Sequence, residues 1–226
     1  MNLLETELGE LKSELIDMTV LVKGQLERCV TSFFTFDKDL AKEVVKNEKR
    51  VNACELKIDS KSEHILALFN PVAIDLRFVV ASLKMVSDLE RIGDHAKGIS
   101  QYLIKCNAPF DAELIEKVRF KEMTDITLEM ITILSESFET DNTKLARTLF
   151  TIDEKLDDIN VKANQVVTEY FRGAEKDPEK ILQAIYLLSI IRKTERVGDY
   201  VTNIAEEIIF YVKAKVLRHK RKGLKA

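Results

Sequence analysis

A ten-residue stretch near the middle of the chain recurs near its end, and this repeat constrains the fold more than any other feature. Residues 87–96 read Ser-Asp-Leu-Glu-Arg-Ile-Gly-Asp-His-Ala, and residues 192–201 read Arg-Lys-Thr-Glu-Arg-Val-Gly-Asp-Tyr-Val. The same offset of 105 aligns Ser32-Phe33 with Ser137-Phe138. One offset that covers long stretches without a gap indicates duplication of a unit of about a hundred residues.

Apolar residues recur at three- and four-residue steps through both copies, which is the period of amphipathic helices. With only 7 glycines and 3 prolines in 226 residues, the composition favours long helices over sheets or disordered tails. Asp37 or Asp39 is expected to cap the second helix, and Asp141 or Asn142 the fifth. Six helices are predicted, over residues 5–36, 37–70, 71–102, 112–138, 142–173 and 178–216.

The predicted fold is all-α, with two tandem three-helix bundles related by a pseudo-twofold axis and built from six long antiparallel helices. Short connections favour antiparallel neighbours. Residues 1–106 form the first repeat and residues 107–226 the second, and the two are expected to pack together as one unit. The stretch Cys106-Asn-Ala-Pro-Phe-Asp111 separates them.

Composition excludes several classes of protein. No apolar run approaches the roughly 18–20 residues of a membrane span. The first ten residues carry acids rather than the basic and apolar regions of a signal peptide. Three widely spaced cysteines, predicted to be buried and inert, fit a reducing cytoplasm.

Charge is distributed unevenly along the chain. The end of the chain, from Lys213 onward, holds seven basic residues and no acid, and the rest of the chain is acidic, which argues against nucleic acid as the main partner. The basic cluster could contact an acidic protein or an anionic membrane surface, or simply end a helix whose macrodipole favours cations there. Its members are Lys213, Lys215, Arg218, Lys220, Arg221, Lys222 and Lys225.

The repeated stretch carries the same pair of acids in each copy. Glu90 and Asp94 are four residues apart, as are Glu195 and Asp199, so on a helix each pair shares one face. Like charges at this spacing destabilise an isolated helix by about 0.2–0.5 kcal/mol, and the glycine between them costs about 1 kcal/mol against alanine. These repeated penalties fit a carboxylate pair that chelates a cation. The alternative is a solvated acidic pair whose glycine permits tight helix packing.

The second helix of each copy adds further acids. Under the offset of 105, Glu48 aligns with Asp153 and Asn52 with Asp157. If the second and third helices pack antiparallel, these oxygens lie beside the acids of the repeated stretch and form a patch of three to five ligands. Hard cations, iron and manganese take carboxylate oxygens. The alternative is a charged, hydrated bundle face.

Histidine usage argues against a catalytic metal centre. His95 is replaced by Tyr200 in the second copy, so it is not a repeated ligand, and the Glu-x-x-His spacing of di-iron bundles does not recur. No phosphate-binding glycine-rich loop and no nucleophile elbow is present. We therefore predict a protein that is not an enzyme, with no catalytic residues. A carboxylate-bridged metalloenzyme and a metal-free structural helical adaptor are the alternatives.

At these residues the chain resembles the PhoU family, the accessory regulators of phosphate-specific transport. The resemblance lies in residues 88–96, in 194–199 with the following Asn203-Ile204-Ala205, and in the entry Pro-Val-Ala-Ile-Asp-Leu-Arg at 71–77. It implies two three-helix repeats with metal clusters on the bundle surface, notably multinuclear iron, with zinc, manganese or another divalent cation as alternatives. The residues that it implies as ligands are Glu48, Glu90, Asp94, Asp153, Asp157, Glu195 and Asp199.

The resemblance also implies a role and partners. It implies a cytoplasmic negative regulator of phosphate uptake and starvation signalling, which links the ATPase of the phosphate ABC transporter to a sensor histidine kinase. A homodimer is expected, at most peripheral at the membrane. Two departures weaken the first site: Gly98-Ile99-Ser100 stands where the family has Asn-Ile-Ala, and Asn52 where it tends to have Asp.

Overall fold

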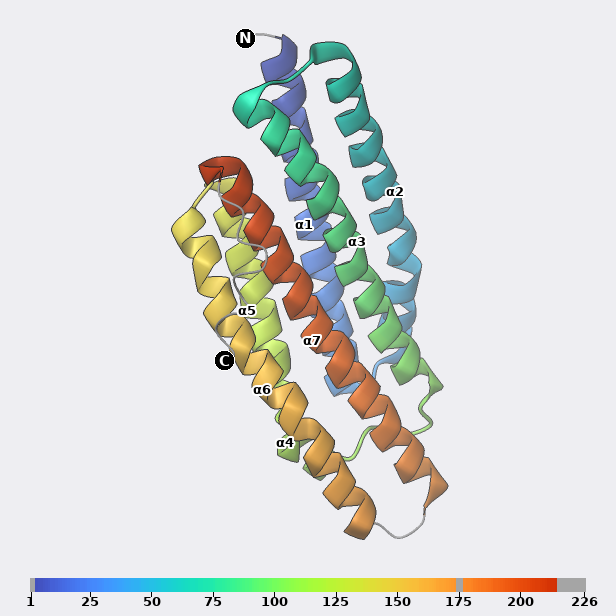
Figure 1. The fold of residues 1–226 in the computed structure, drawn as a ribbon. Helices are drawn as coiled ribbons and strands as arrows, with labels where there is room; N and C mark the ends of the chain where they lie inside the picture. Colours follow the sequence, from blue (N-terminus) through green and yellow to red (C-terminus); the bar gives the residue numbers. More distant parts are fainter. Residues whose placement is uncertain (1–2, 174–176, 215–226) are drawn as a thin grey trace.

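Long helices follow the apolar periodicity over nearly the whole chain (Figure 1). The computed structural model describes residues 3–173 and 177–214, and within these ranges it contains helices and no strand. This confirms the predicted all-α class. The helices are α1 (Leu3–Thr35), α2 (Lys38–Phe69), α3 (Ala73–Lys105), α4 (Ala112–Lys117), α5 (Phe120–Glu139), α6 (Thr143–Gly173) and α7 (Pro178–Lys213).

Side-chain caps fix several of the helix starts, including that of α4, where Asp111 accepts from the N–H groups of residues 113 and 114. Asp37, rather than Asp39, caps α2 and accepts from the backbone N–H groups of residues 39 and 40. Asn142, rather than Asp141, accepts from the N–H groups of residues 144 and 145 at the start of α6. Asp177 caps α7, with Pro178 in its first turn. Each cap satisfies N–H groups that have no partner inside the helix.

The third predicted helix begins later and ends later than expected. Asn70 ends α2 in the left-handed region (φ 45°), and Ala73 is also left-handed (φ 50°), so Pro71 lies in the connection rather than in the first helical turn. Val72 stands at the N-cap position and has no side chain that can cap the helix. The helix then continues to Lys105 instead of stopping near Tyr102.

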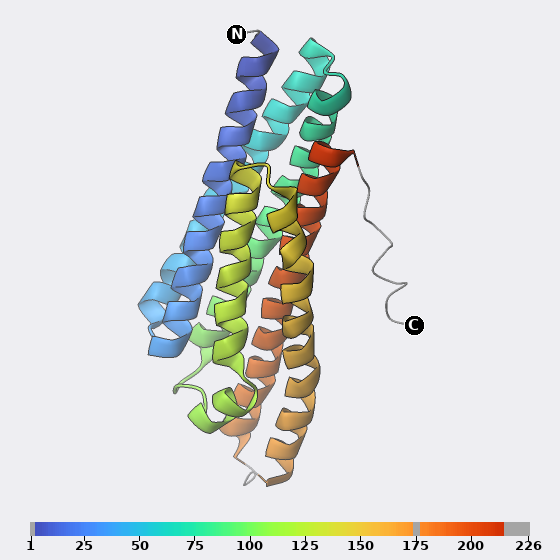
Figure 2. The same ribbon diagram turned by 90° about the vertical axis from the view of Figure 1, so that its left-hand side faces the viewer.

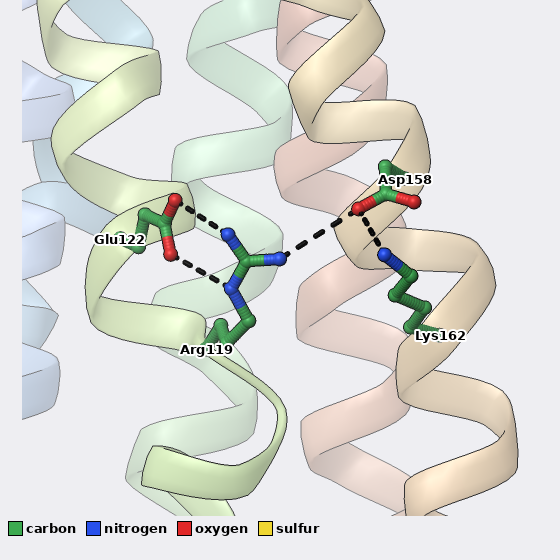
Figure 3. A network of polar contacts seen from close by, with 4 residues as sticks. All are labelled: Arg119, Glu122, Asp158 and Lys162. Carbon is green, nitrogen blue, oxygen red and sulfur yellow. Dashed lines mark hydrogen bonds and ion pairs between the residues drawn. The ribbon is translucent and has the colours of Figure 1, made fainter.

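The fourth predicted helix is interrupted, so residues 3–173 and 177–214 form six long helices and the short α4. The break occurs at Arg119, whose φ of 57° is left-handed. Its guanidinium donates to both carboxylate oxygens of Glu122, at 2.8 and 2.7 Å, and lies 3.6 Å from Asp158 on α6 (Figure 3). Asp158 also pairs with Lys162 at 2.7 Å. These ion pairs accompany a backbone conformation that costs a non-glycine residue about 1–2 kcal/mol.

Two three-helix bundles lie side by side (Figures 1 and 2). Helices α1, α2 and α3 pack together, as do α5, α6 and α7, and the bundles meet where α3 packs on α7 and α1 on α5. His95 of α3 stacks on Tyr200 of α7, with ring centroids 5.5 Å apart. Because these residues are offset by 105, the stacked pair marks the predicted pseudo-twofold axis.

The cysteines are free thiols. Cys29 and Cys106 are buried and Cys54 is partly buried. Burial raises the pKa of the Cys29 thiol to about 12 and raises that of Cys106, so neither is ionised near neutral pH. Within the described residues, no helix is both long and apolar enough to cross a membrane. Of the predicted basic cluster, residues 215–226 lie outside the described ranges.

Candidate metal centres

Each repeat brings the acids of its third long helix against an acid of its second. In the first repeat, α3 carries Glu90 and Asp94 and α2 carries the buried Glu48. Burial raises the pKa of Glu48, and the charges of the two α3 acids raise it further. This proximity follows from the antiparallel packing of α2 on α3. The structure therefore assembles the first of the two predicted groups.

The second repeat assembles the other group. Helix α7 carries Glu195 and Asp199, and α6 carries Asp157 and the buried Asp153. Burial raises the pKa of Glu195, and the charges of Asp199, Asp157 and Asp153 raise it further, against the opposing effect of Arg196. Three carboxyl groups from two helices thus lie within electrostatic range of Glu195.

The glycine of each repeated stretch allows the two helices to approach. A Cβ atom at Gly198 would lie 2.6 Å from Asp153 Oδ1 and 2.6 Å from a methyl group of Leu156. A Cβ at Gly93 would lie 3.2 Å from Val51 and 3.5 Å from Glu48 Oε2. In both repeats, therefore, a bare backbone lets the buried acid of the neighbouring helix sit beside the acids of the motif.

Two amide side chains hold Glu48, and sequence reasoning missed this arrangement. Gln25 Nε2 of α1 donates to Glu48 Oε2 at 3.1 Å. The Asn52 amide, in the orientation that satisfies both groups, donates to Glu48 Oε1 at 3.0 Å. A signal was available, because Gln25 is a polar residue within the apolar stripe of the first helix, and a buried amide needs a partner.

Basic side chains lie beside the acids at both sites. In the first, Lys97 pairs with Asp94 at 3.0 Å. In the second, Arg196 lies 3.3 Å from Asp199 and 3.9 Å from Glu195. The Lys97–Asp94 and Arg196–Asp199 pairs are partly exposed to solvent, and exposed ion pairs contribute about 0–1 kcal/mol each. Such pairs leave the carboxylates able to exchange a side-chain cation for another.

The chemistry of the predicted ligands fits a hard cation, but their side chains are not arranged around a metal position. All seven predicted ligands are carboxylates, and burial raises the pKa values of Glu48, Glu90 and Glu195. Over the described ranges, however, no group of three or more His, Cys, Asp and Glu side chains has the arrangement of a metal-binding set. Coordination would therefore require rotation of these side chains.

Basic and aromatic side chains, among them Arg91, His95 and Tyr200, pack together where α3 meets α7. The guanidinium of Arg91 lies 5.6 Å from the centre of the Tyr200 ring. Burial, with the charges of Lys193 and Arg196, lowers the pKa of His95 to about 4, against the opposing effect of Asp94. The imidazole is therefore neutral near pH 7 and belongs to the packing between the repeats.

Comparison with known proteins agrees with the duplicated geometry. The PhoU domain matches the chain twice, over residues 15–103 and 120–208, and these stretches show the same offset of 105. The chain belongs to the PhoU family. A phosphate-specific transport system accessory protein, PhoU homolog 1 of Thermotoga maritima, is 32% identical over 98% of this chain and 94% of its own length. PhoU of Escherichia coli K12 is 30% identical over 94% of this chain and 86% of its own length.

Solved PhoU structures share the fold. The crystal structure of PhoU from Pseudomonas aeruginosa matches with a TM-score of 0.83 and 28% identity, over 93% of this chain and 99% of that one. The PhoU regulatory protein of Streptococcus pneumoniae matches with a TM-score of 0.85 at 24% identity, over 95% and 99% of the two chains. The two-repeat helical architecture is therefore that of the PhoU family.

Proposed function

We propose that this chain is a non-enzymatic accessory protein that regulates phosphate-specific transport, and that it binds cations at its two carboxylate sites. The family membership supports the first part, because relatives similar over nearly their whole length are named as accessory proteins of that system. The single observation that supports the second is the assembly of partly buried carboxylates at matching places in both repeats.

Glu195, Asp199, Asp153 and Asp157 would hold the cation in the second repeat, and Glu90, Asp94 and Glu48 in the first. When bound, a multivalent cation, with iron as the first candidate, would supply positive charge that neutralises acids now repelling one another. The glycine of each motif keeps the two helices close enough for acids from both to contribute. The protein's own part is thus to position oxygens and to keep mutually repelling acids together.

We further propose that the protein acts in the cytoplasm as a homodimer, linking the transporter's ATPase to a sensor histidine kinase and repressing the starvation response when phosphate is plentiful. This part of the proposal, on location, partners and repression, is supported by the resemblance to the PhoU family. Long helices that expose polar faces over the length of the bundle offer surface for such protein contacts.

A metal-free adaptor is the second candidate. It is favoured by the absence, in the described part of the chain, of a group of acids already arranged around a metal position. The two candidates differ in what the acids do, since an adaptor without metal needs them only as a hydrated face. They are separated by removing the acids and following regulation and metal content together.

Complementation of an Escherichia coli strain that lacks its own PhoU tests the proposed function. The chain should restore low expression of phosphate-starvation genes in high phosphate and should restore normal phosphate uptake. Glu195→Ala with Asp199→Ala should weaken both effects, whereas Asp125→Ala with Glu129→Ala, which removes an exposed acid pair from α5, should not. Failure of the folded, expressed wild type to change either readout would contradict the regulatory role.

A further inference from the structure

A hollow of about 300 Å³ lies where the end of α3 meets the beginning of α7. Pro178, Leu182 and Tyr186 contribute apolar side chains to its lining. The other lining residues are Lys105, Cys106, Asn107, Glu179 and Gln183.

The opposite end of the molecule shows what occupies the equivalent place in the other repeat. There Phe78 of α3 packs on Tyr211 of α7, with ring centroids 5.3 Å apart and an interplanar angle of 70°. The offset of 105 aligns Phe78 with Gln183 and Cys106 with Tyr211. At the hollow, therefore, an amide and a thiol stand where the other repeat has two aromatic rings.

The backbone also differs between the end of α3 and the equivalent end of α7. Helix α7 continues past Tyr211 to Lys213, whereas α3 ends at Lys105 and the chain turns away at Cys106, whose ψ is 141°. The Gln183 side chain is held against this departing chain, because its Nε2 donates to the carbonyl of Ala108 at 3.0 Å. Two smaller side chains and an earlier helix end thus leave space at this end of the bundle.

The lining suits a ring with a polar substituent. The Tyr186 ring, itself 5.0 Å from Tyr102, provides a face for stacking. Lys105 and Glu179 also line the hollow, and their side chains offer a hydrogen-bond donor and an acceptor. An enclosed apolar cavity of about 150 Å³ binds benzene in another protein. The hollow is more open, since Leu182 is 46% exposed, but its volume of about 300 Å³ is large enough for a single ring.

We propose that this hollow binds a small aromatic molecule that carries one hydrogen-bonding group, the chemistry of phenol. The inference is independent of the carboxylate sites, because the hollow shares no residue with them. Its occupant replaces the ring that Tyr211 provides in the other repeat.

Titration with phenol, followed by the NMR signals of Tyr186 and of labelled Cys106, tests the proposal. Half-saturation is expected at about 1–10 mM, as for a ligand of so few atoms. Cyclohexanol, which has a similar size and the same hydroxyl but no aromatic face, should bind at least about tenfold more weakly.

Two variants that copy the other repeat should close the hollow. Cys106→Tyr and, separately, Gln183→Phe should each weaken phenol binding at least tenfold, and a variant that unfolds by circular dichroism would be set aside in favour of the other. Val20→Phe, an exposed change on α1, a helix that contributes none of the lining residues named above, should leave binding intact. No shift of either signal at 50 mM phenol, equal binding of cyclohexanol, or undiminished binding by folded variants would overturn the proposal.

Discussion

Asn52 and Asp157 occupy the same place in the two repeats, yet they act differently on the acids beside them. Asn52 donates a hydrogen bond to Glu48, whereas Asp157 adds a negative charge that raises the pKa of Glu195. The first site therefore satisfies its buried acid with amide donors, and the second accumulates charge. We expect the second site to bind a multivalent cation more tightly than the first, since its carboxylates have more repulsion to lose.

The accumulated charge predicts a pH-dependent effect of Glu195→Gln on the metal-free protein. The folded protein raises the pKa of Glu195 above its value of 4.5, so ionisation of this group disfavours the folded state as pH rises from about 4.5 toward neutrality. Without metal, the variant should melt on the order of 1–2 °C higher than the wild type at pH 7.5.

The difference in Tm between the two proteins should shrink as the pH is lowered to 4.5 and below, because the wild-type carboxyl then becomes protonated in the folded state and increasingly also in the unfolded state. Calorimetry at several pH values in the presence of chelator measures this difference in Tm. The comparison cancels the contribution of other groups, including His95, whose lowered pKa acts in the opposite direction. A wild type that gains stability over the variant as pH rises would contradict the assigned repulsion.

At the scale of elements, the glycines set how closely the second and third long helices of each repeat pack. Gly198→Ala would place a methyl group 2.6 Å from Asp153 Oδ1 and from Leu156 Cδ1. Such overpacking costs about 1–3 kcal/mol, which the helix propensity of alanine offsets by about 1 kcal/mol. We expect a net loss of up to about 2 kcal/mol in the free energy of unfolding, measured by urea denaturation.

Two other glycines provide graded controls for this prediction. Gly93→Ala meets its nearest atom at 3.2 Å and should change stability by less than about 1 kcal/mol. Gly24 of α1 has no such neighbour within 4 Å, so Gly24→Ala should stabilise the protein by up to about 1 kcal/mol. If Gly198→Ala were as stable as Gly24→Ala, close packing at the motif would not be the reason for the glycine.

The sequence predicted the long helices well, because most of the periodic apolar residues of both repeats are buried, although Leu68, Leu76 and Ile185 are exposed. It did not predict the break at Arg119, since arginine has no preference for the left-handed conformation that the backbone adopts there. The site was predictable where one residue type recurred at a fixed offset, as with Glu90 and Glu195. The partner of Gln25 was harder to predict, because a polar residue in the apolar stripe of α1 signals a buried contact but does not show that Glu48 of α2 makes it.

At the scale of the whole molecule, a polar contact joins the repeats near the end of α7. The Tyr211 hydroxyl donates to Asp141 Oδ1 in the turn between α5 and α6, and Lys12 of α1 pairs with the same carboxylate at 3.0 Å. Burial raises the pKa of Tyr211, so the phenol remains a donor at physiological pH. This contact connects the first helix of one repeat with two segments of the other.

Tyr211→Phe should therefore destabilise the protein by about 1–2 kcal/mol, because it removes the hydroxyl and leaves the ring in place. Thermal unfolding should show a fall of roughly 3–6 °C in Tm. Tyr170→Phe is the matched control, since Tyr170 donates to Asp111 at 3.0 Å at a more accessible position. Its effect should be smaller, and equal losses in the two variants would count against a special role for the contact between repeats.

The most direct test of the central claim, that the duplicated acids are cation sites, is metal content per chain by plasma mass spectrometry. Protein purified without chelator and reloaded with iron should contain metal that falls with Glu90→Ala/Asp94→Ala and falls further with Glu195→Ala/Asp199→Ala. Asp125→Ala/Glu129→Ala should retain the wild-type content. No metal in the wild type, or a content unchanged by both motif variants, would contradict the claim and make the acids a hydrated packing face.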